Sequence, residues 1–189
     1  MNNPINKIKQ QISNCKKCSL HKTRNKVVVG EWNKNAKIMF IGIAPGRLGG
    51  DKTGIPFSKD KSGILLRKLL EKSSIDSSKT TITNLIRCNP KDEKGNNRNP
   101  SRKEIELCSG FLEKEIELIN PKIIVPLGKI PTEYILKEKI KGMKKYHTKM
   151  IKKGKIIIFP MYHPSYITNY SGYKEKDYEK DFKRLGELI

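Results

Sequence analysis

Short β-branched stretches alternate with helical stretches along the chain, and this alternation constrains the fold more than any other feature of the sequence. Buried strands are predicted at residues 37–43, 81–87, 122–127 and 155–161. Helices are predicted at residues 62–72, 101–119, 128–136 and 174–188, and Ser101 and Glu104 form a capping box at the start of the second. Strands that are separated by helices form parallel sheets with right-handed crossovers. We therefore predict a three-layer α/β/α fold with a central four-stranded parallel sheet, as a single domain over residues 1–189.

Three of these predicted strands end in turns that are polar or rich in proline and glycine. GIAPG (42–46) follows the first strand, TNLIRCNP (83–90) closes the second, and YHPS (162–165) follows the fourth. Ligands of open α/β sheets bind outside the carboxyl ends of the strands. The three turns therefore predict one binding site at one edge of the sheet. GIAPG lacks the Gly-Lys-Ser/Thr ending of a phosphate loop, which disfavours a nucleotide hydrolase.

Four side chains in or near these turns are candidates for chemistry, and each also has a structural alternative. Phe57 can stack on a planar ring or belong to the core. Asp60 can take part in catalysis or only cap the helix that follows it. Asn84 has both a hydrogen-bond donor and an acceptor, but it can also tie down a turn. His163 is one of only three histidines, and its place in the YHPS turn favours a functional role over a structural one.

The four cysteines indicate a metal centre, with four unrelated thiols as the alternative, because only the C-x-x-C spacing is a recognisable signature. Cys15 and Cys18 form a C-x-x-C pair, whereas Cys88 follows a predicted strand and Cys108 lies in a predicted helix. The first residues lack the apolar segment of a secretory signal, so we expect an intracellular protein of the cytoplasm or nucleoid, not a secreted one, in which disulfides are rare. A four-thiolate zinc site and a four-iron cluster use the same ligands, so the residues leave both open. Basic neighbours such as Arg87 are expected to lower the thiol pKa values.

The chain has 40 Lys and Arg residues against 19 Asp and Glu residues, a formal net charge of +21. Nucleic acid is the natural partner for such a charge, because each neutralised phosphate releases counterions; a merely solvated basic surface is the alternative. The longest apolar run, residues 38–45, is far too short for a membrane helix. No paired carboxylates accompany the turns, which disfavours a phosphate-ester enzyme. We therefore expect a protein that binds DNA and not a membrane.

The turns and the cysteines, taken in order, resemble the uracil-DNA glycosylase superfamily, specifically its iron–sulfur branch of families four and five. The pattern G-x-A-P-G…G-x-x-x-T-G-x-x-F-x-x-D-x-S-G over residues 42–63 is most similar to family five. TN-x-x-R-C (83–88), the helix with Cys108, LG (127–128) and HPS (163–165) follow in the same order. The resemblance covers residues 15–172, and its motifs are specific in combination although each is weak alone.

The resemblance implies a monofunctional glycosylase that excises uracil from single- or double-stranded DNA, acts as a monomer and leaves an abasic site. Hypoxanthine and xanthine are further candidate substrates, because Ile43 and Ala44 put no polar side chain into the pocket. The four cysteines would hold a 4Fe–4S cluster that ties in the N-terminal segment, with zinc as the alternative. A non-catalytic, metal-stapled nucleic-acid-binding module is the competing hypothesis.

The resemblance also implies roles for single residues. Phe57 would stack under the flipped base, Asn84 would hydrogen-bond its edge, and His163 would face a base carbonyl oxygen. Asp60 would position water or stabilise the sugar cation. The remaining predicted substrate-binding residues are Gly42, Ala44, Pro45, Gly46 and Ser165. The loop after His163 would insert into the duplex, with Tyr166 and Ile167 as candidates for the inserted side chain.

Overall fold

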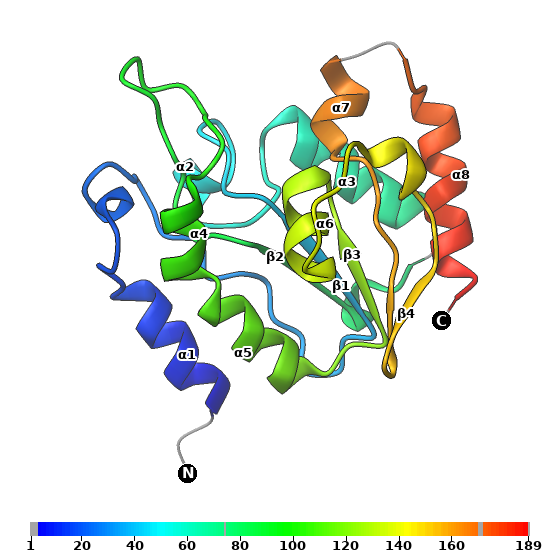
Figure 1. Cartoon of the computed structure of the whole chain (residues 1–189), viewed down its shortest axis with the longest axis horizontal. Coiled ribbons are helices and arrows are strands. Elements are labelled where there is room, and N and C mark those ends of the chain that lie inside the picture. Colours follow the sequence, from blue (N-terminus) through cyan, green and yellow to red (C-terminus); the bar gives the residue numbers. More distant parts are fainter. Residues whose placement is uncertain (1–3, 74, 170–171, 189) are drawn as a thin grey trace.

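A twisted five-stranded sheet forms the centre of the computed structural model, which describes residues 4–73, 75–169 and 172–188 (Figure 1). The strand order is β2-β1-β3-β5-β4. β1 (Ile38–Gly42), β2 (Thr80–Asn84), β3 (Ile123–Pro126) and β5 (Ile156–Ile158) are parallel, whereas β4 (Ile151–Lys153) is antiparallel to β5. The register pairs Gly42 with Asn84 at the carboxyl ends of β1 and β2. The polar turns after these strands therefore meet at one edge.

The predicted four-stranded parallel sheet is wrong in one respect, because β4 adds an antiparallel fifth strand. The two-residue turn Gly154–Lys155 joins β4 to β5, and Gly154 has the left-handed φ of 61° that glycine tolerates. Two of the three residues of β4 are exposed lysines. Such charged, short edge strands lack the apolar pattern of a buried strand and protect the sheet from edge-to-edge pairing.

Helices cover both faces of the sheet, as the predicted layering requires. α3 (Lys61–Lys72) and α8 (Glu175–Gly186) pack on the face that contains Phe40, while α5 (Gly110–Ile119) and α6 (Lys129–Leu136) pack on the face that contains Met39 (Figure 1). Successive residues of a strand point to opposite faces. All five residues of β1 are buried, which explains its uniformly apolar sequence.

The predicted helix over residues 101–119 is instead two helices, α4 (Arg102–Cys108) and α5. The break lies at Ser109 and Gly110, and such Ser/Gly pairs are common sites of helix kinks. The predicted capping box is present: the Ser101 hydroxyl accepts a hydrogen bond from the Glu104 N–H, and the Glu104 carboxylate accepts one from the Ser101 N–H. The kink leaves Cys108 at the end of α4.

The N-terminal helix α1 (Pro4–Ser13) was not predicted. It buries Ile8 and Ile12 in the same apolar cluster as α5, and it leads directly into the C-x-x-C pair. Two short helices, α2 (Gly50–Thr53) and α7 (Pro164–Asn169), lie in the segments that follow β1 and β5. Among the described residues, no helix is long and apolar enough to cross a membrane.

Candidate active site

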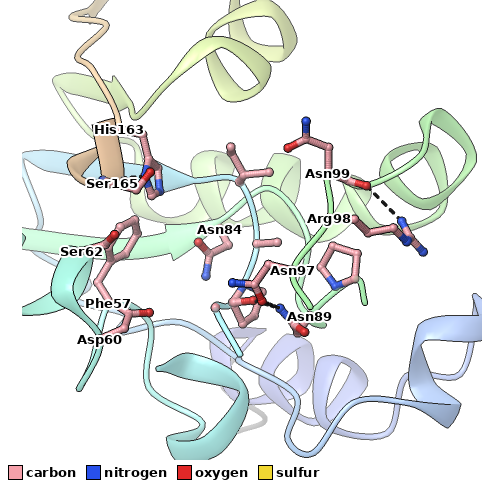
Figure 2. Close-up of a pocket in the computed structure, with 15 residues that line it drawn as sticks. Phe57, Asp60, Ser62, Asn84, Asn89, Asn97, Arg98, Asn99, His163 and Ser165 are labelled. Carbon is pink, nitrogen blue, oxygen red and sulfur yellow. Dashed lines mark hydrogen bonds between the residues drawn. The ribbon is translucent and has the colours of Figure 1, made fainter. Parts of the chain in front are cut away.

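A cavity of about 480 Å³ lies at the carboxyl ends of β1 and β2 (Figure 2). Ten of its lining residues are labelled in Figure 2, and they come from segments that are far apart in the sequence. The predicted site residues that line it are Ala44, Pro45, Gly46, Phe57, Asp60, Asn84, His163 and Ser165. Gly42 does not line the cavity but lies directly beneath the Asn84 and Phe57 side chains. The three predicted turns thus converge on a single hollow.

Asn84 is the last residue of β2 and presents an amide with an unused acceptor. Its side chain is buried, and its Oδ1 has no hydrogen-bond partner among the described residues. A buried polar atom that lacks a partner costs about 1–3 kcal/mol. A ligand that offers an N–H to this oxygen would remove that cost, so Asn84 is suited to recognise a donor on a planar base.

Phe57 belongs both to the core and to the wall of the cavity. Its backbone has a φ of 47°, which is unusual for a residue other than glycine. The Arg67 Nε donates to the Phe57 carbonyl at 2.8 Å and holds this conformation. The ring centroid lies 5.7 Å from that of His163, with a tilt of 37° between the planes. Unusual backbone geometry of this kind clusters at ligand sites, where the surrounding structure enforces it.

His163 follows the last parallel strand and presents one nitrogen to the cavity. Its Nδ1 accepts a hydrogen bond from the Ser165 N–H at 3.1 Å and lies 2.8 Å from the Ser165 hydroxyl. Because Nδ1 is an acceptor, these contacts assign the ring proton to Nε2. Burial lowers the pKa of His163 to about 4, so the ring is neutral at neutral pH. The site therefore holds a neutral imidazole with an Nε2–H donor.

Asp60 caps the helix that follows it, as predicted, and it also lines the cavity. Its Oδ1 accepts a hydrogen bond from the Gly63 N–H at 2.8 Å at the start of α3. A Cβ on Gly46 would lie 2.6 Å from Oδ2, so only glycine lets the loop approach this carboxylate. Burial raises the pKa of Asp60 above its ordinary value, and the Gly63 hydrogen bond opposes that rise. Asp60 is the one acid among the residues that line the described cavity.

The second wall of the cavity comes from the loop after β2, whose lining residues were not among the predicted site residues beyond Asn84. The Asn89 Nδ2 donates to the Pro45 carbonyl at 2.6 Å and to the Asn97 Oδ1 at 2.8 Å. The same Asn97 oxygen accepts from the Arg47 N–H at 2.9 Å. These bonds fasten the loop after β2 to the glycine-rich loop after β1. The repeated asparagines directly after the TNLIRC turn were the available signal.

The four cysteines line a separate, largely apolar cavity beside α1 and α4. The Arg24 Nη1 donates to the Cys88 Sγ at 3.1 Å, and the Arg87 backbone N–H donates to the Cys108 Sγ at 3.3 Å. Burial raises the pKa of Cys108 to about 11 and also raises that of Cys88, so the expected lowering by basic neighbours is outweighed for these two thiols. Four thiols with donors aimed at two of them form a donor set that fits a thiolate-bound centre.

The four thiols line one cavity but do not form a preassembled metal site. In residues 4–73, 75–169 and 172–188, no three His, Cys, Asp or Glu side chains, the four cysteines included, are grouped so that they could hold a metal ion.

A buried carboxylate connects the cysteine segment to the glycine-rich loop. Asp51 of α2 is fully buried and accepts from the backbone N–H and the side-chain Nδ2 of Asn25 at 2.9 and 2.6 Å. The Lys91 ammonium lies 2.9 Å from Asp51 and also donates to the Thr23 carbonyl at 2.8 Å. The Asp51 carboxylate therefore connects three segments: the segment after the C-x-x-C pair, the loop after Cys88 and the loop that lines the pocket.

Comparison with known protein families identifies the superfamily of this chain. Residues 29–185 match the family model of the uracil DNA glycosylase superfamily. The chain belongs to this superfamily. A type-4 uracil-DNA glycosylase of Sulfurisphaera tokodaii is 38% identical over 97% of this chain and 84% of the relative. The type-4 enzyme of Archaeoglobus fulgidus is 35% identical over 97% of this chain and 92% of the relative. The predicted superfamily is confirmed.

The expected closer likeness to family five needs correction. A type-5 uracil-DNA glycosylase of Pyrobaculum aerophilum is 27% identical over 69% of this chain and 62% of the relative, which is less than the type-4 relatives above. The expectation depended on one loop, residues 42–63, whereas identity over most of the chain favours the type-4 members of the uracil DNA glycosylase superfamily.

Proposed function

We propose that this protein is a monofunctional DNA glycosylase of base excision repair, which excises uracil from DNA and leaves an abasic site. The observation that carries the proposal is the convergence of an aromatic ring, an unpartnered amide oxygen and a neutral imidazole on one cavity (Figure 2). Membership of the superfamily and the type-4 relatives support uracil as the base.

The three side chains match the faces of a flipped uracil. The Phe57 ring stacks on the base, and Asn84 accepts the N3–H with Oδ1 while its Nδ2 donates to the neighbouring carbonyl oxygen. The His163 Nε2–H donates to the carbonyl oxygen where negative charge develops as the bond to the sugar breaks. One preorganised donor of this kind is worth about 3–4 kcal/mol in the transition state.

Asp60 acts on the sugar side of the reaction. As the bond between C1′ and the base nitrogen breaks, positive charge develops on the sugar, and a carboxylate stabilises that charge or positions the attacking water. Neither Ile43 nor Ala44 offers a polar group for this purpose, although both line the cavity. No lysine lines the cavity among the described residues, which supports hydrolysis rather than a Schiff-base lyase step.

DNA is bound by the strongly basic surface, and the target base leaves the stack at a cost of a few kcal/mol, which is smaller for a mispaired base. Tyr166 of α7 is 37% exposed, and its ring stacks on that of Tyr162 at 4.8 Å. Ile167 packs against the core instead. Tyr166 is therefore a better candidate than Ile167 for the side chain that fills the space left by the flipped base in duplex DNA.

A wider range of bases follows from the size of the site. A cavity of about 480 Å³ with an apolar wall at Ile43 and Ala44 leaves room beyond a single pyrimidine ring. Hypoxanthine and xanthine also present an N–H beside a carbonyl oxygen, which the Asn84 amide can bind in the same way, and xanthine has a second carbonyl oxygen for His163. We therefore include both purines among the substrates.

Cys15, Cys18, Cys88 and Cys108 hold a 4Fe–4S cluster in this proposal. The donor set of four thiols around one apolar cavity supports it, with a zinc ion as the alternative. When bound, the cluster would supply a covalent crosslink between α1, α4 and the end of β2, and it would take no part in base excision.

Release of free base from an oligonucleotide with one uracil tests the proposal. His163→Ala and Asn84→Ala should each lower the single-turnover rate by on the order of 10²-fold or more. Asn35→Ala is a matched control, because Asn35 is exposed before β1, at the opposite edge of the sheet. Binding without base release by the wild type would instead identify the non-catalytic module.

The metal centre has its own test. The wild type should show the broad visible absorbance of an iron–sulfur cluster, and Cys88→Ala should lose this absorbance and unfold more easily. A colourless, folded wild type that contains one zinc ion would overturn the cluster while leaving the glycosylase proposal intact.

A further inference from the structure

His147 contacts the residue that precedes His163 in two ways. The His147 ring stacks on the Tyr162 ring, with centroids 4.0 Å apart and a tilt of 34°. Its Nδ1 accepts from the Tyr162 backbone N–H at 3.1 Å. Its Nε2 lies 2.9 Å from the Asp181 Oδ2. Because Nδ1 is an acceptor, the ring proton lies on Nε2, and this N–H donates a hydrogen bond to Asp181.

The backbone carbonyl of Tyr162 is also held by a side chain. The Tyr178 hydroxyl donates to the Tyr162 carbonyl at 2.6 Å, and the Tyr173 hydroxyl donates to Asp181 at 2.7 Å. We call His147, Tyr173, Tyr178 and Asp181 the Tyr162 clamp. Both backbone polar groups of Tyr162 are thus bound by this clamp.

The position of Tyr162 in the fold explains why a clamp is needed. β5 ends at Ile158, and its neighbour β4 pairs only with residues 156–158. From residue 159 onward, the chain lacks a continuous series of strand hydrogen bonds on the β4 side. Buried backbone N–H and C=O groups there still need hydrogen-bond partners. Tyr162 obtains them from side chains of a distant loop and of α8.

We propose that His147, oriented by Asp181, is a positioning residue that holds His163 and the start of α7 in register with the base pocket. Tyr162 joins the two: its peptide leads into His163, and its ring lies between those of His147 and Tyr166. The Tyr166 N–H donates to the His163 carbonyl at 2.8 Å, so α7 begins on the same fixed backbone. This inference rests on the proposed role of His163 in base excision.

The polar contacts set this arrangement apart from ordinary aromatic packing. The His147 side chain is only 8% exposed, and burying an imidazole beside a carboxylate is unfavourable unless both are hydrogen-bonded. A phenyl ring in place of His147 could keep the stack on Tyr162. It would leave the Tyr162 N–H without its acceptor and the Asp181 carboxylate with Tyr173 but without His147 as a donor, which frees the backbone before His163.

Two substitutions of His147 separate these contributions. His147→Phe keeps a stacking ring and removes both hydrogen bonds. His147→Asn places an amide oxygen where Nδ1 lies, and it restores an acceptor for the Tyr162 N–H. Tyr146→Phe is the control, since Tyr146 directly precedes His147 in the loop and its hydroxyl donates to Glu138 at 2.9 Å.

Single-turnover excision of uracil and binding of an oligonucleotide with non-cleavable 2′-fluoro-deoxyuridine give the two readouts. We expect His147→Phe to lower the excision rate by about 10- to 100-fold while the Kd changes by no more than about threefold, because small displacements of a catalytic group affect the rate most. His147→Asn should recover much of the rate, and Tyr146→Phe should match the wild type. A wild-type rate for His147→Phe, or equal losses in rate and binding without recovery by asparagine, would refute the positioning role.

A spectroscopic readout keeps this inference separate from the proposed function. The imidazole signals of His163 in ¹H–¹⁵N spectra, assigned with a His163→Gln variant, should shift or broaden in His147→Phe but not in Tyr146→Phe. If the wild type releases no base, the glycosylase proposal fails while these signals still test the clamp. If His147→Phe does not fold, Asp181→Ala removes the acceptor for His147 Nε2 and for the Tyr173 hydroxyl while keeping the imidazole, and it should change the same signals; an unchanged spectrum would refute the clamp.

Discussion

Replacing Gly42 with alanine tests whether the base pocket is built directly on the sheet. A Cβ on Gly42 would lie 2.7 Å from Cε2 and from Cζ of Phe57, and it would also meet the Asn84 Oδ1. Carbon atoms pack at about 3.5–4.0 Å, so the ring would have to move by about 1 Å. Phe57 has little freedom to do so, because its left-handed backbone is held by Arg67.

The size of the effect follows from these contacts. Overpacking a buried site costs about 1–3 kcal/mol, which corresponds to a fall in Tm of roughly 2–12 °C for a domain of this length. A displacement of about 1 Å at the reacting groups lowers the rate by on the order of 10²-fold. Gly42→Ala should therefore reduce excision far more than its modest loss of stability explains.

Single-turnover excision and thermal unfolding measure the two effects side by side. Gly110→Ala is the control, because a Cβ there has no neighbour within 4 Å and Gly110 lies in α5. Gly110 is the first residue of α5 and does not line the cavity, so this variant should keep the wild-type rate and a Tm close to that of the wild type. Excision by Gly42→Ala at the wild-type rate would show that Phe57 and Asn84 do not define the reacting geometry.

Three further predictions follow from named contacts. The pKa of His163 is about 4 when folded and 6.5 in the unfolded chain, so the unfolded state binds more protons between these values and stability falls as the pH drops from 6.5 towards 4. Urea unfolding should show up to about 3 kcal/mol of this loss in the wild type and not in His163→Gln; parallel pH curves would contradict it. Glu115→Ala leaves the buried Arg87 without its partner at 2.5 Å and should cost about 3–5 kcal/mol. Glu106→Ala, which breaks an exposed pair, should cost less than about 1 kcal/mol, and equal costs would refute the distinction. Arg24→Gln removes the donor to Cys88 and should speed the loss of visible absorbance in air relative to Lys26→Gln.

β1, β3 and β5 were predictable because burial in a sheet favours unbroken apolar stretches, whereas β2, with the sequence TTITN, was indicated by its β-branched residues. Every residue of β1 and β2 is buried, and the register that brings Gly42 beside Asn84 follows from the parallel topology. Turns at the carboxyl ends of such strands must meet, so Phe57, Asn84 and His163 could be assigned to one site before their geometry was known.

Elements without a strong apolar period were missed. The three residues of β4 include two exposed lysines, and α1 buries only Ile8 and Ile12 along ten residues. The kink at Ser109 does not interrupt the apolar pattern of residues 101–119, so nothing in the periodicity separated α4 from α5. In each case tertiary packing decides the structure where the local pattern is ambiguous.

The groups that support the site were beyond sequence reasoning for a different reason. His147 and Asp181 are 34 residues apart, and each is an unremarkable residue in a lysine-rich stretch until the fold brings both against Tyr162. Asp51 likewise joins Asn25 and Lys91 only in the folded chain. The residues proposed to contact the base follow the carboxyl ends of parallel strands, which topology places at one edge of the sheet, whereas the residues proposed to orient them come from any element that packs nearby. The geometry of the site therefore depends on contacts that no local sequence pattern reveals. We expect substitutions of His147 or Asp51 to lower the excision rate although every proposed reacting residue is still present.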